Sequence, residues 1–376
     1  MTQADAYVSP RKIADIERLR GLAALLVVIC HIAGTFYNLN ITSPLPGRVF
    51  GWIGACGVAL FFVISGFCIR LPEARALHTH GKVRLDVREF LIRRFLRIAP
   101  PYWIALIASI GAGYLYKTQQ IDGAHSPLDI ATHVLVLHSL LPSTFYTING
   151  VFWTIGIEVH FYLAYILFAN RPARVWMAAA LLVLALAAYG AASRLMAMDN
   201  PWRTVGQQFF ITSFWQWYIG ALIADWWVKR PRTGPGLLLW PARIVLFVFT
   251  LALGLTDPKV AGLHINGWIL PCAAAVLVLL FVIRPAGAGE DSPLLEPANV
   301  LGRASYSLYL FHPVALSIGA FAVAGRGWPV WVGAVISLFL ALALAAAAYG
   351  LIEKPLLAWR ARLRKPSAPP REAAVA

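Results

Sequence analysis

Apolar runs of about twenty residues follow one another along almost the whole chain, and this is the length a helix needs to cross roughly 30 Å of hydrocarbon. A soluble core can bury many apolar side chains, but it does not need uninterrupted runs of this length. Of the 376 residues, 59% are hydrophobic and only 13% are charged, whereas soluble domains carry about 25% charged residues. The sequence therefore predicts an all-α, polytopic membrane protein.

The apolar runs predict about ten transmembrane helices, joined by short linkers. The predicted spans are residues 19–37, 51–71, 95–116, 152–169, 173–193, 207–228, 237–255, 266–283, 305–323 and 330–352. We expect a cytoplasmic N-terminal segment over 1–18, one membrane domain over 19–355, and a basic, disordered cytoplasmic tail over 356–376. The first run lacks a convincing cleavage site, so we interpret it as a retained span that also targets the chain.

The basic residues indicate the orientation of these spans. With the N-terminus in the cytoplasm, all but six of the 32 lysines and arginines fall on the cytoplasmic side. The exceptions are Arg48, Lys117, Arg194, Arg203, Lys259 and Arg326. The positive-inside rule describes this bias, so both termini are predicted to be cytoplasmic. Because the basic residues lie between apolar runs, the net charge of +15 does not point to a nucleic-acid partner.

The cysteines predict neither a disulfide framework nor a metal site. All four lie in apolar segments, and no two have the CxxC spacing of a zinc or redox motif. They are Cys30, Cys56, Cys68 and Cys272. We therefore expect no bound metal ion.

One apolar segment, residues 129–141, is too short for an ordinary span. Counting it as a span would invert every later loop and place the basic ones outside. We instead expect an interfacial or re-entrant helix on the outer side. Between Pro127 and Pro142, such a helix could cover a cavity.

His31 is the first ionisable residue inside a predicted span, and such residues are costly unless they have a function. It follows Arg20 by eleven residues, which corresponds to roughly 16 Å of helix and close to three turns. Both side chains therefore share a face, with His31 near the middle of the membrane. Histidine can act there as a general base or a transient nucleophile. A neutral histidine that only hydrogen-bonds between helices is the alternative.

Glu158 lies about five residues inside another predicted span, so its carboxylate needs a partner or a water-filled cavity. It could orient His31 or bind an acceptor hydroxyl. A structural ion pair or an interfacial position are the alternatives. His160 is a weaker candidate because it lies on a different face of the helix from Glu158.

Arg94 and Arg97 end the basic loop that precedes the third predicted span. They are three residues apart and share a helical face, so their planar guanidinium groups could hold phosphates at the cytoplasmic mouth of a cavity. For the rest of the loop, which includes Arg84 and Arg88, topology and attraction to anionic lipid are the better explanation.

Three other motifs carry weaker signals. His312 stands directly before Pro313 in a predicted span, where the proline leaves a backbone carbonyl without its helical donor, so a kink and a polar pocket are expected. Residues 353–355, Glu-Lys-Pro, suit a helix C-terminus, and Pro355 is expected to stop the helix. The small residues of 57–67 indicate close helix packing.

These residues resemble acyltransferase family 3, the membrane O-acyltransferases of bacterial surface glycans and some antibiotics. The resemblance covers residues 16–355, and several motifs match in the family's order. They are Leu19-Arg20-Gly21 with His31 at the Arg-x10-His spacing, Phe-Phe-x-x-Ser-Gly-Phe at 61–67, Arg94 and Arg97, Trp153 to Tyr162 with Glu158, Ser305 to Pro313, and Ile-Glu-Lys-Pro at 352–355. Two departures concern the site. Ala59 replaces a common acidic residue, which excludes a role for a carboxylate there, and Val159-His160 replaces a common Glu-Gln, so the acceptor pocket can differ.

The resemblance implies an enzyme of the bacterial inner (cytoplasmic) membrane that uses acetyl-CoA, or another acyl-CoA, from the cytoplasmic side. The acceptor would be a hydroxyl of a glycan, a lipid-linked sugar or a small molecule on the outer side. Arg94 and Arg97 would hold the CoA phosphates, and Arg20 would help bind CoA or position the first helix. His31 would deprotonate the acceptor or carry the acyl group briefly, and Glu158 would position the acceptor or His31.

A proton-coupled transporter or flippase is the alternative from another class, because such carriers also use intramembrane His and Glu. Transporters often contain two related halves, and the Arg20, His31 and Glu158 patterns have no convincing second copy. A non-catalytic scaffold would leave the paired arginines and the histidine unexplained.

Overall fold

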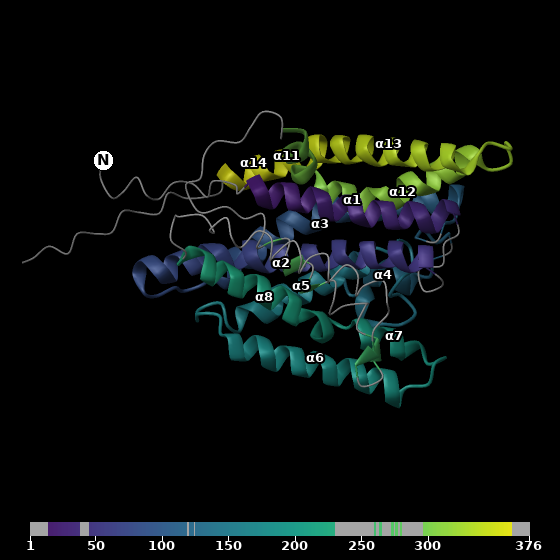
Figure 1. Ribbon diagram of the computed structural model, residues 1–376. Helices are drawn as coiled ribbons and strands as arrows, with labels where there is room; N and C mark the ends of the chain where they lie inside the picture. Colours follow the sequence, from purple (N-terminus) through teal and green to yellow (C-terminus); the bar gives the residue numbers. More distant parts are fainter. Residues whose placement is uncertain are drawn as a thin grey trace, which may run out of the picture.

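Helices that run side by side make up nearly all of the described structure (Figure 1). The computed structural model describes residues 14–37, 45–118, 120–123, 125–229, 259–260, 263–264, 272–273, 275–276, 279 and 296–362. The longer helices are α1 (Ala14–Tyr37), α2 (Leu45–His80), α3 (Val87–Leu115), α5 (Trp153–Ile166), α6 (Val175–Leu195), α8 (Phe210–Val228), α12 (Ser305–Val323) and α13 (Val330–Ala348). The shorter elements are α4 (Pro127–Val134), η2 (His138–Leu140), α7 (Pro201–Gln208), α11 (Glu296–Arg303), η4 (Tyr349–Glu353), α14 (Lys354–Arg362) and the strands β1 (Lys259–Val260) and β2 (Leu263–His264).

Six of the described helices are long and apolar enough to cross a membrane. These segments are Ile16–Tyr37, Val49–His80, Val87–Leu115, Val175–Leu195, Ser305–Val323 and Val330–Trp359. The chain is therefore a multi-pass membrane protein, as its apolar runs predict.

Four of the ten predicted spans are not among these six segments. The spans at 152–169 and 207–228 correspond to α5 and α8, and α5 has only 14 residues. The spans at 237–255 and 266–283 lie outside the described residues, apart from a few positions of the second. The number of ten spans stays a prediction.

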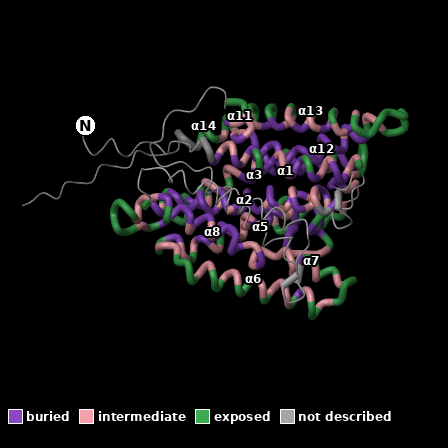
Figure 2. The backbone as a smooth tube through the Cα atoms, viewed as in Figure 1, coloured by how far each residue is buried: buried purple, intermediate pink, exposed green. Residues whose placement is uncertain are grey.

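The outer helices α6 and α13 carry many exposed positions (Figure 2), and several of these hold large apolar residues. Only 11% of the apolar stretch of α6 is buried inside the protein, whereas 78% of the apolar stretch of α12 is buried. Trp176 and Leu184 on α6 are exposed, and so are Trp331 and Phe339 on α13. In water such surfaces would favour association, whereas in a bilayer they contact lipid chains.

The basic residues before the third span belong to a helix, which corrects the prediction of a loop there. α3 begins at Val87, eight residues earlier than predicted, because the Asp86 side chain accepts a hydrogen bond from the Glu89 backbone N–H at 2.9 Å and caps the helix. Glu89 also pairs with Arg93 one turn later at 2.6 Å. Arg94 and Arg97 are therefore held on a regular helix surface.

Small residues allow α2 and α8 to pack with their backbones in contact, as the motif at 57–67 predicts. A Cβ on Gly66 would lie 1.8 Å from the Trp217 carbonyl oxygen, and one on Gly220 would lie 2.0 Å from that of Val63. Neither position can carry a side chain without separating the helices. This contact brings the α2 residues near α5 and α8 into a defined register.

A buried ion pair links α2 to α8. Arg70 Nε donates to Asp225 Oδ1 at 2.7 Å, Nη2 donates to Oδ2 at 3.2 Å, and Nη1 donates to the Ala169 carbonyl at 2.6 Å. Asp225 Oδ2 also accepts from the Ala173 backbone N–H at 2.6 Å. The pair therefore joins α2, α8 and the turn between α5 and α6.

The short elements gather at the two ends of the long helices (Figure 1). α11, α14 and the turn between α2 and α3 lie at one end, and α4 and the turn between α12 and α13 lie toward the other. The helix predicted at 129–141 is shorter than expected, because α4 ends at Val134 and the chain reverses at Val136, whose φ is 59°. Pro355 does not stop the last helix. It lies in the first turn of α14, where its missing N–H is tolerated, after the π-helical segment η4.

Candidate active site

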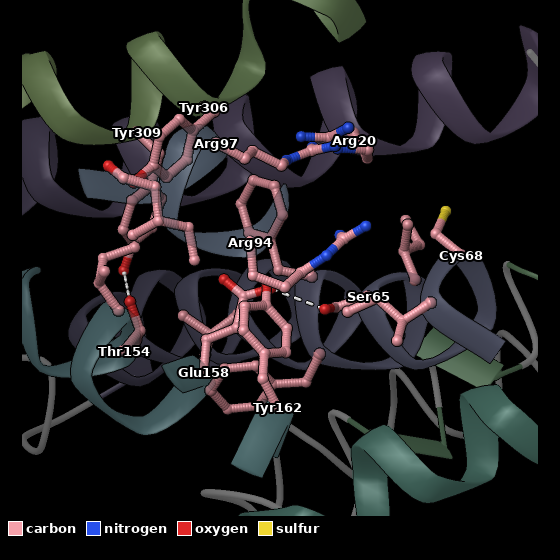
Figure 3. Close-up of a pocket in the computed structure, with 17 residues that line it drawn as sticks. Arg20, Ser65, Cys68, Arg94, Arg97, Thr154, Glu158, Tyr162, Tyr306 and Tyr309 are labelled. Carbon is pink, nitrogen blue, oxygen red and sulfur yellow. Dashed lines mark hydrogen bonds between the residues drawn. The ribbon is translucent and has the colours of Figure 1, made fainter. Parts of the chain in front are cut away.

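A cavity of about 100 Å³ lies between α1, α2, α3, α5 and α12 (Figure 3). Most of its wall is apolar. The polar side chains that line it are Arg20, Ser65, Cys68, Arg94, Arg97, Thr154, Glu158, Tyr162, Tyr306 and Tyr309. Four residues predicted from sequence thus meet in one place: the three arginines and Glu158.

The three guanidinium groups make this cavity strongly cationic. Arg94 lies over the rings of Phe90 and Tyr162, at 5.7 and 5.8 Å from their centroids. Within the described part of the chain, no carboxylate forms a salt bridge with Arg20, Arg94 or Arg97, and the Arg94 Nε is buried without a hydrogen-bond acceptor. Unpaired cations in a membrane protein are costly, and an anionic ligand would remove that cost.

Glu158 is held by two hydroxyl groups. Its Oε1 accepts hydrogen bonds from Ser65 Oγ at 2.7 Å and from Tyr162 Oη at 2.6 Å. Trp217 Nε1 in turn donates to Ser65 Oγ at 3.2 Å, so the serine is itself oriented. Among the described residues Oε2 has no hydrogen-bond partner, and it is the oxygen left for a ligand.

His31 lies near the cavity but does not line it. Its Nδ1 is 2.8 Å from Nε2 of His312 on α12, and the two ring planes are inclined by only 8°. The centroid of the His312 ring is 6.0 Å from that of Tyr309, which lines the cavity. The partner that contacts His31 is therefore His312 and not Glu158.

His160 lies apart from this group. Its Nδ1 is 2.7 Å from the Gly156 carbonyl, and its ring stacks on Phe210 of α8 at 5.2 Å. It does not line the cavity. This agrees with its prediction as the weaker candidate.

Several residues that complete the site were not identified from the sequence. Ser65 was interpreted as part of a packing motif, although a hydroxyl amid apolar residues of a span is itself a signal. Tyr162 lies four residues after Glu158, the spacing at which helix side chains meet. Tyr309 is held by Thr154 Oγ1 at 2.7 Å and by the Val151 carbonyl at 3.1 Å, contacts between distant segments that no local pattern reveals.

A second cavity of about 120 Å³ shares Arg20 and Arg97 with the first. Residues of α11, η4 and α14 line it, including Arg303 and Glu353. Glu353 accepts hydrogen bonds from the backbone N–H and the hydroxyl of Ser307. The two cavities together extend from the end of the molecule that carries α11 and α14 toward Tyr309.

A family model described as an acyltransferase domain matches residues 13–350, which is nearly the whole chain. The chain belongs to the acyltransferase 3 family. The resemblance in its motifs is thereby confirmed, and this acyltransferase is a membrane-bound O-acyltransferase. The cationic cavity, Glu158 and the His31–His312 pair all lie within the matched residues.

Several curated relatives resemble this acyltransferase over most of its length. It is 30% identical to the exopolysaccharide production protein ExoZ of Rhizobium meliloti, over 84% of this chain and 93% of that protein. It is 26% identical to nodulation protein 10 of Rhizobium leguminosarum bv. viciae, over 93% of this chain and 94% of that protein. The putative peptidoglycan O-acetyltransferase YrhL of Bacillus subtilis is 24% identical over 92% of this chain and 55% of its own. No solved structure matches the chain.

Proposed function

We propose that this acyltransferase moves an acyl group, in the first place acetyl, from cytoplasmic acyl-CoA to a hydroxyl of a glycan on the outer side of the bacterial inner membrane. The observation that carries the proposal is the convergence of Arg20, Arg94 and Arg97 on one cavity without a carboxylate partner among the described residues. CoA is polyanionic, and guanidinium groups bind phosphate oxygens through paired, charge-assisted hydrogen bonds.

The donor would occupy both cavities. Because Arg20 and Arg97 line both, they can bind phosphates at the junction, with the nucleotide in the second cavity and the pantetheine arm in the first. The apolar wall of the first cavity suits the uncharged arm. Arg94, on the same face of α3 as Arg97, would bind a further phosphate oxygen.

The proposed orientation is supported by the distribution of charge. One end of the long helices carries α11, α14 and the turn between α2 and α3. These segments contain basic residues that the positive-inside rule assigns to the cytoplasm. The second cavity lies at that end. Acyl-CoA would therefore enter from the cytoplasm, and only the acyl group would cross toward the outer side.

His31 would perform the transfer. In a direct route it accepts the proton of the acceptor hydroxyl while that oxygen attacks the thioester carbonyl carbon; the C–S bond breaks and the CoA thiolate takes up a proton. In a two-step route a ring nitrogen attacks the thioester carbonyl carbon, the C–S bond breaks and CoA leaves as the thiolate; the acyl group then passes to the acceptor hydroxyl, whose proton goes to the CoA sulfur. Both routes yield an O-acyl ester and free CoA.

Tyr309 lines the cavity and also contacts the histidine pair: its ring centroid is 5.5 Å from that of Phe61, which lines the cavity too, and 6.0 Å from that of His312. Tyr309 is held by two hydrogen bonds, whereas Phe61 is held only by packing. Glu158, with its free Oε2, would bind the acceptor hydroxyl or a water that leads to it.

A glycan is the acceptor class that the relatives favour, since their names include exopolysaccharide production and peptidoglycan O-acetylation. A lipid-linked sugar or a small-molecule alcohol is chemically equivalent at the reacting hydroxyl. Membership of an acyltransferase family favours transfer over transport of an intact solute.

Acyl transfer from isotope-labelled acetyl-CoA, added to inside-out vesicles with native acceptors, tests the proposal. Wild type and His31→Ala would be compared at matched protein levels. We expect label in glycan or lipid-linked sugar with wild type only. Full activity of His31→Ala would remove His31 from the mechanism. If acetyl-CoA were used by right-side-out vesicles and not by inside-out vesicles, the proposed cytoplasmic side of the donor would be wrong.

A further inference from the structure

His312 is tied to its own helix through one ring nitrogen. Its Nδ1 lies 2.8 Å from the Tyr309 carbonyl oxygen and 3.2 Å from that of Leu308. A carbonyl oxygen only accepts hydrogen bonds, so Nδ1 of His312 must carry a proton. The side chain is fully buried, and no solvent competes for this contact.

Pro313 makes this contact available. In a regular helix the N–H of residue 313 would donate to the carbonyl of Tyr309, but proline has no N–H. Pro313 lies inside α12, so the freed carbonyl needs another donor in an apolar environment. His312, the residue directly before the proline, supplies it.

The proton on Nδ1 determines the state of the other ring. With both rings neutral, Nε2 of His312 carries a lone pair and can only accept, so His31 Nδ1, at 2.8 Å, must be the donor. His31 then keeps its lone pair on Nε2. That nitrogen has no hydrogen-bond partner among the described residues, and the His31 side chain is partly exposed.

We propose that His312 is the positioning residue of the transfer reaction: it accepts a hydrogen bond from His31 Nδ1 and thereby presents the Nε2 lone pair of His31 to the reacting groups. This inference rests on the proposed role of His31. An orienting group that holds a catalytic imidazole in the required tautomer is a general feature of such sites. Here the group is a neutral histidine, whereas serine hydrolases use a carboxylate.

The proton transfer balances with this arrangement. In the direct route, Nε2 of His31 takes the proton from the acceptor hydroxyl, and the resulting imidazolium keeps its Nδ1 hydrogen bond to His312. It then gives the Nε2 proton to the departing CoA sulfur, which restores the starting tautomer. In the two-step route the same Nε2 lone pair forms the bond to the acyl carbon. His312 neither gains nor loses a proton in either route.

Replacement of His312 tests the proposal kinetically. We expect His312→Leu to lower kcat about 10²-fold, with the KM for acyl-CoA nearly unchanged, because only the orientation of the base is lost. His312→Gln, whose amide oxygen can accept from His31 Nδ1, should recover kcat to within about tenfold of wild type. His160→Leu is the matched control: it also removes an intramembrane histidine that bonds a helical carbonyl and stacks on an aromatic ring, and its kcat should not change.

Nitrogen-15 NMR of histidine-labelled protein in bilayers tests the tautomer without any activity measurement, with His31→Gln used to assign the His31 signals. We expect a protonated Nδ1 and a bare Nε2 in wild type, and loss of this preference in His312→Leu. A proton on Nε2 of His31 in wild type would overturn the proposal. Unchanged kcat in His312→Leu would also overturn it while leaving the donor and acceptor assignments intact, whereas full activity of His31→Ala would remove the proposed role of His31 on which it rests, and absence of transfer by wild type would overturn the proposed function.

Discussion

Ser65 on α2 donates a hydrogen bond of 2.7 Å to Glu158 on α5, and the two residues face the same cavity from opposite helices (Figure 3). The contact places a carboxylate beside three guanidinium groups without an ion pair to any of them among the described residues. Glu158 is therefore available to a ligand, and its orientation depends on its hydroxyl neighbours.

Glu158→Gln should lower kcat by about 10²-fold, because an amide can donate to the acceptor group and no longer holds it in the attacking geometry. Ser65→Ala should give a smaller loss, since Tyr162 still holds the carboxylate. Initial rates at matched protein levels, with thermal unfolding in detergent as the control, check both. A lower protein yield with a normal rate per molecule would indicate a purely structural role.

Arg94→Ala combined with Arg97→Ala should raise the KM for acyl-CoA by about tenfold or more, because a hydrogen bond to a charged group contributes about 1.5–3 kcal/mol. Arg84→Ala is the control: it removes one exposed positive charge from the turn before α3. Titration of acyl-CoA against initial rate distinguishes them. Equal effects of the two changes would mean that this end of the protein contributes only general positive charge.

Breaking the pair between Arg70 and Asp225 should destabilise the protein strongly. Arg70→Met leaves a buried carboxylate with fewer partners, which costs about 3–5 kcal/mol in comparable cases. Glu89→Gln, in the exposed pair with Arg93, should cost only about 0.2–1 kcal/mol. Thermal unfolding followed by tryptophan fluorescence measures both, and similar shifts for the two variants would contradict the prediction.

The stacked histidines at the α4 end should make stability depend on pH. His133 and His138 are buried with ring centroids 4.2 Å apart. Burial lowers the pKa of His138 from 6.5 to about 3 and lowers that of His133 as well. The unfolded chain therefore binds more protons below pH 6.5, so the stability present above that pH is lost as the pH falls toward the folded pKa.

His138→Phe should reduce that pH dependence between about pH 6.5 and pH 4, because the ring keeps its stacking partner and cannot be protonated. His78→Ala, at an exposed position of α2, should leave it unchanged. Unfolding midpoints measured across this range provide the comparison. A wild-type midpoint that does not fall between pH 6.5 and pH 4 would contradict the prediction.

Local spacing made much of the site predictable. Arg20 and His31 were predicted to share one helix face, and Arg94 and Arg97 another, because a helix has 3.6 residues per turn. Glu158 was singled out by its depth in an apolar run, because a charge in lipid is costly. The start of α3 could also have been predicted, since Asp86 and Glu89 form a recognisable helix cap. The predicted cover by residues 129–141 is not observed: none of them lines either cavity.

The sequence by itself determined that the chain is a membrane protein, which residues carry its unusual charges, and which of them share a helix face. Only the tertiary structure decided which faces meet: that Arg20 joins the α3 arginines, that Ser65 holds Glu158, and that His31 contacts His312. The physical reason is that helix register depends on contacts such as Gly66 against the Trp217 backbone. Such contacts arise from the shapes of two distant segments together, and the periodicity of neither segment contains them.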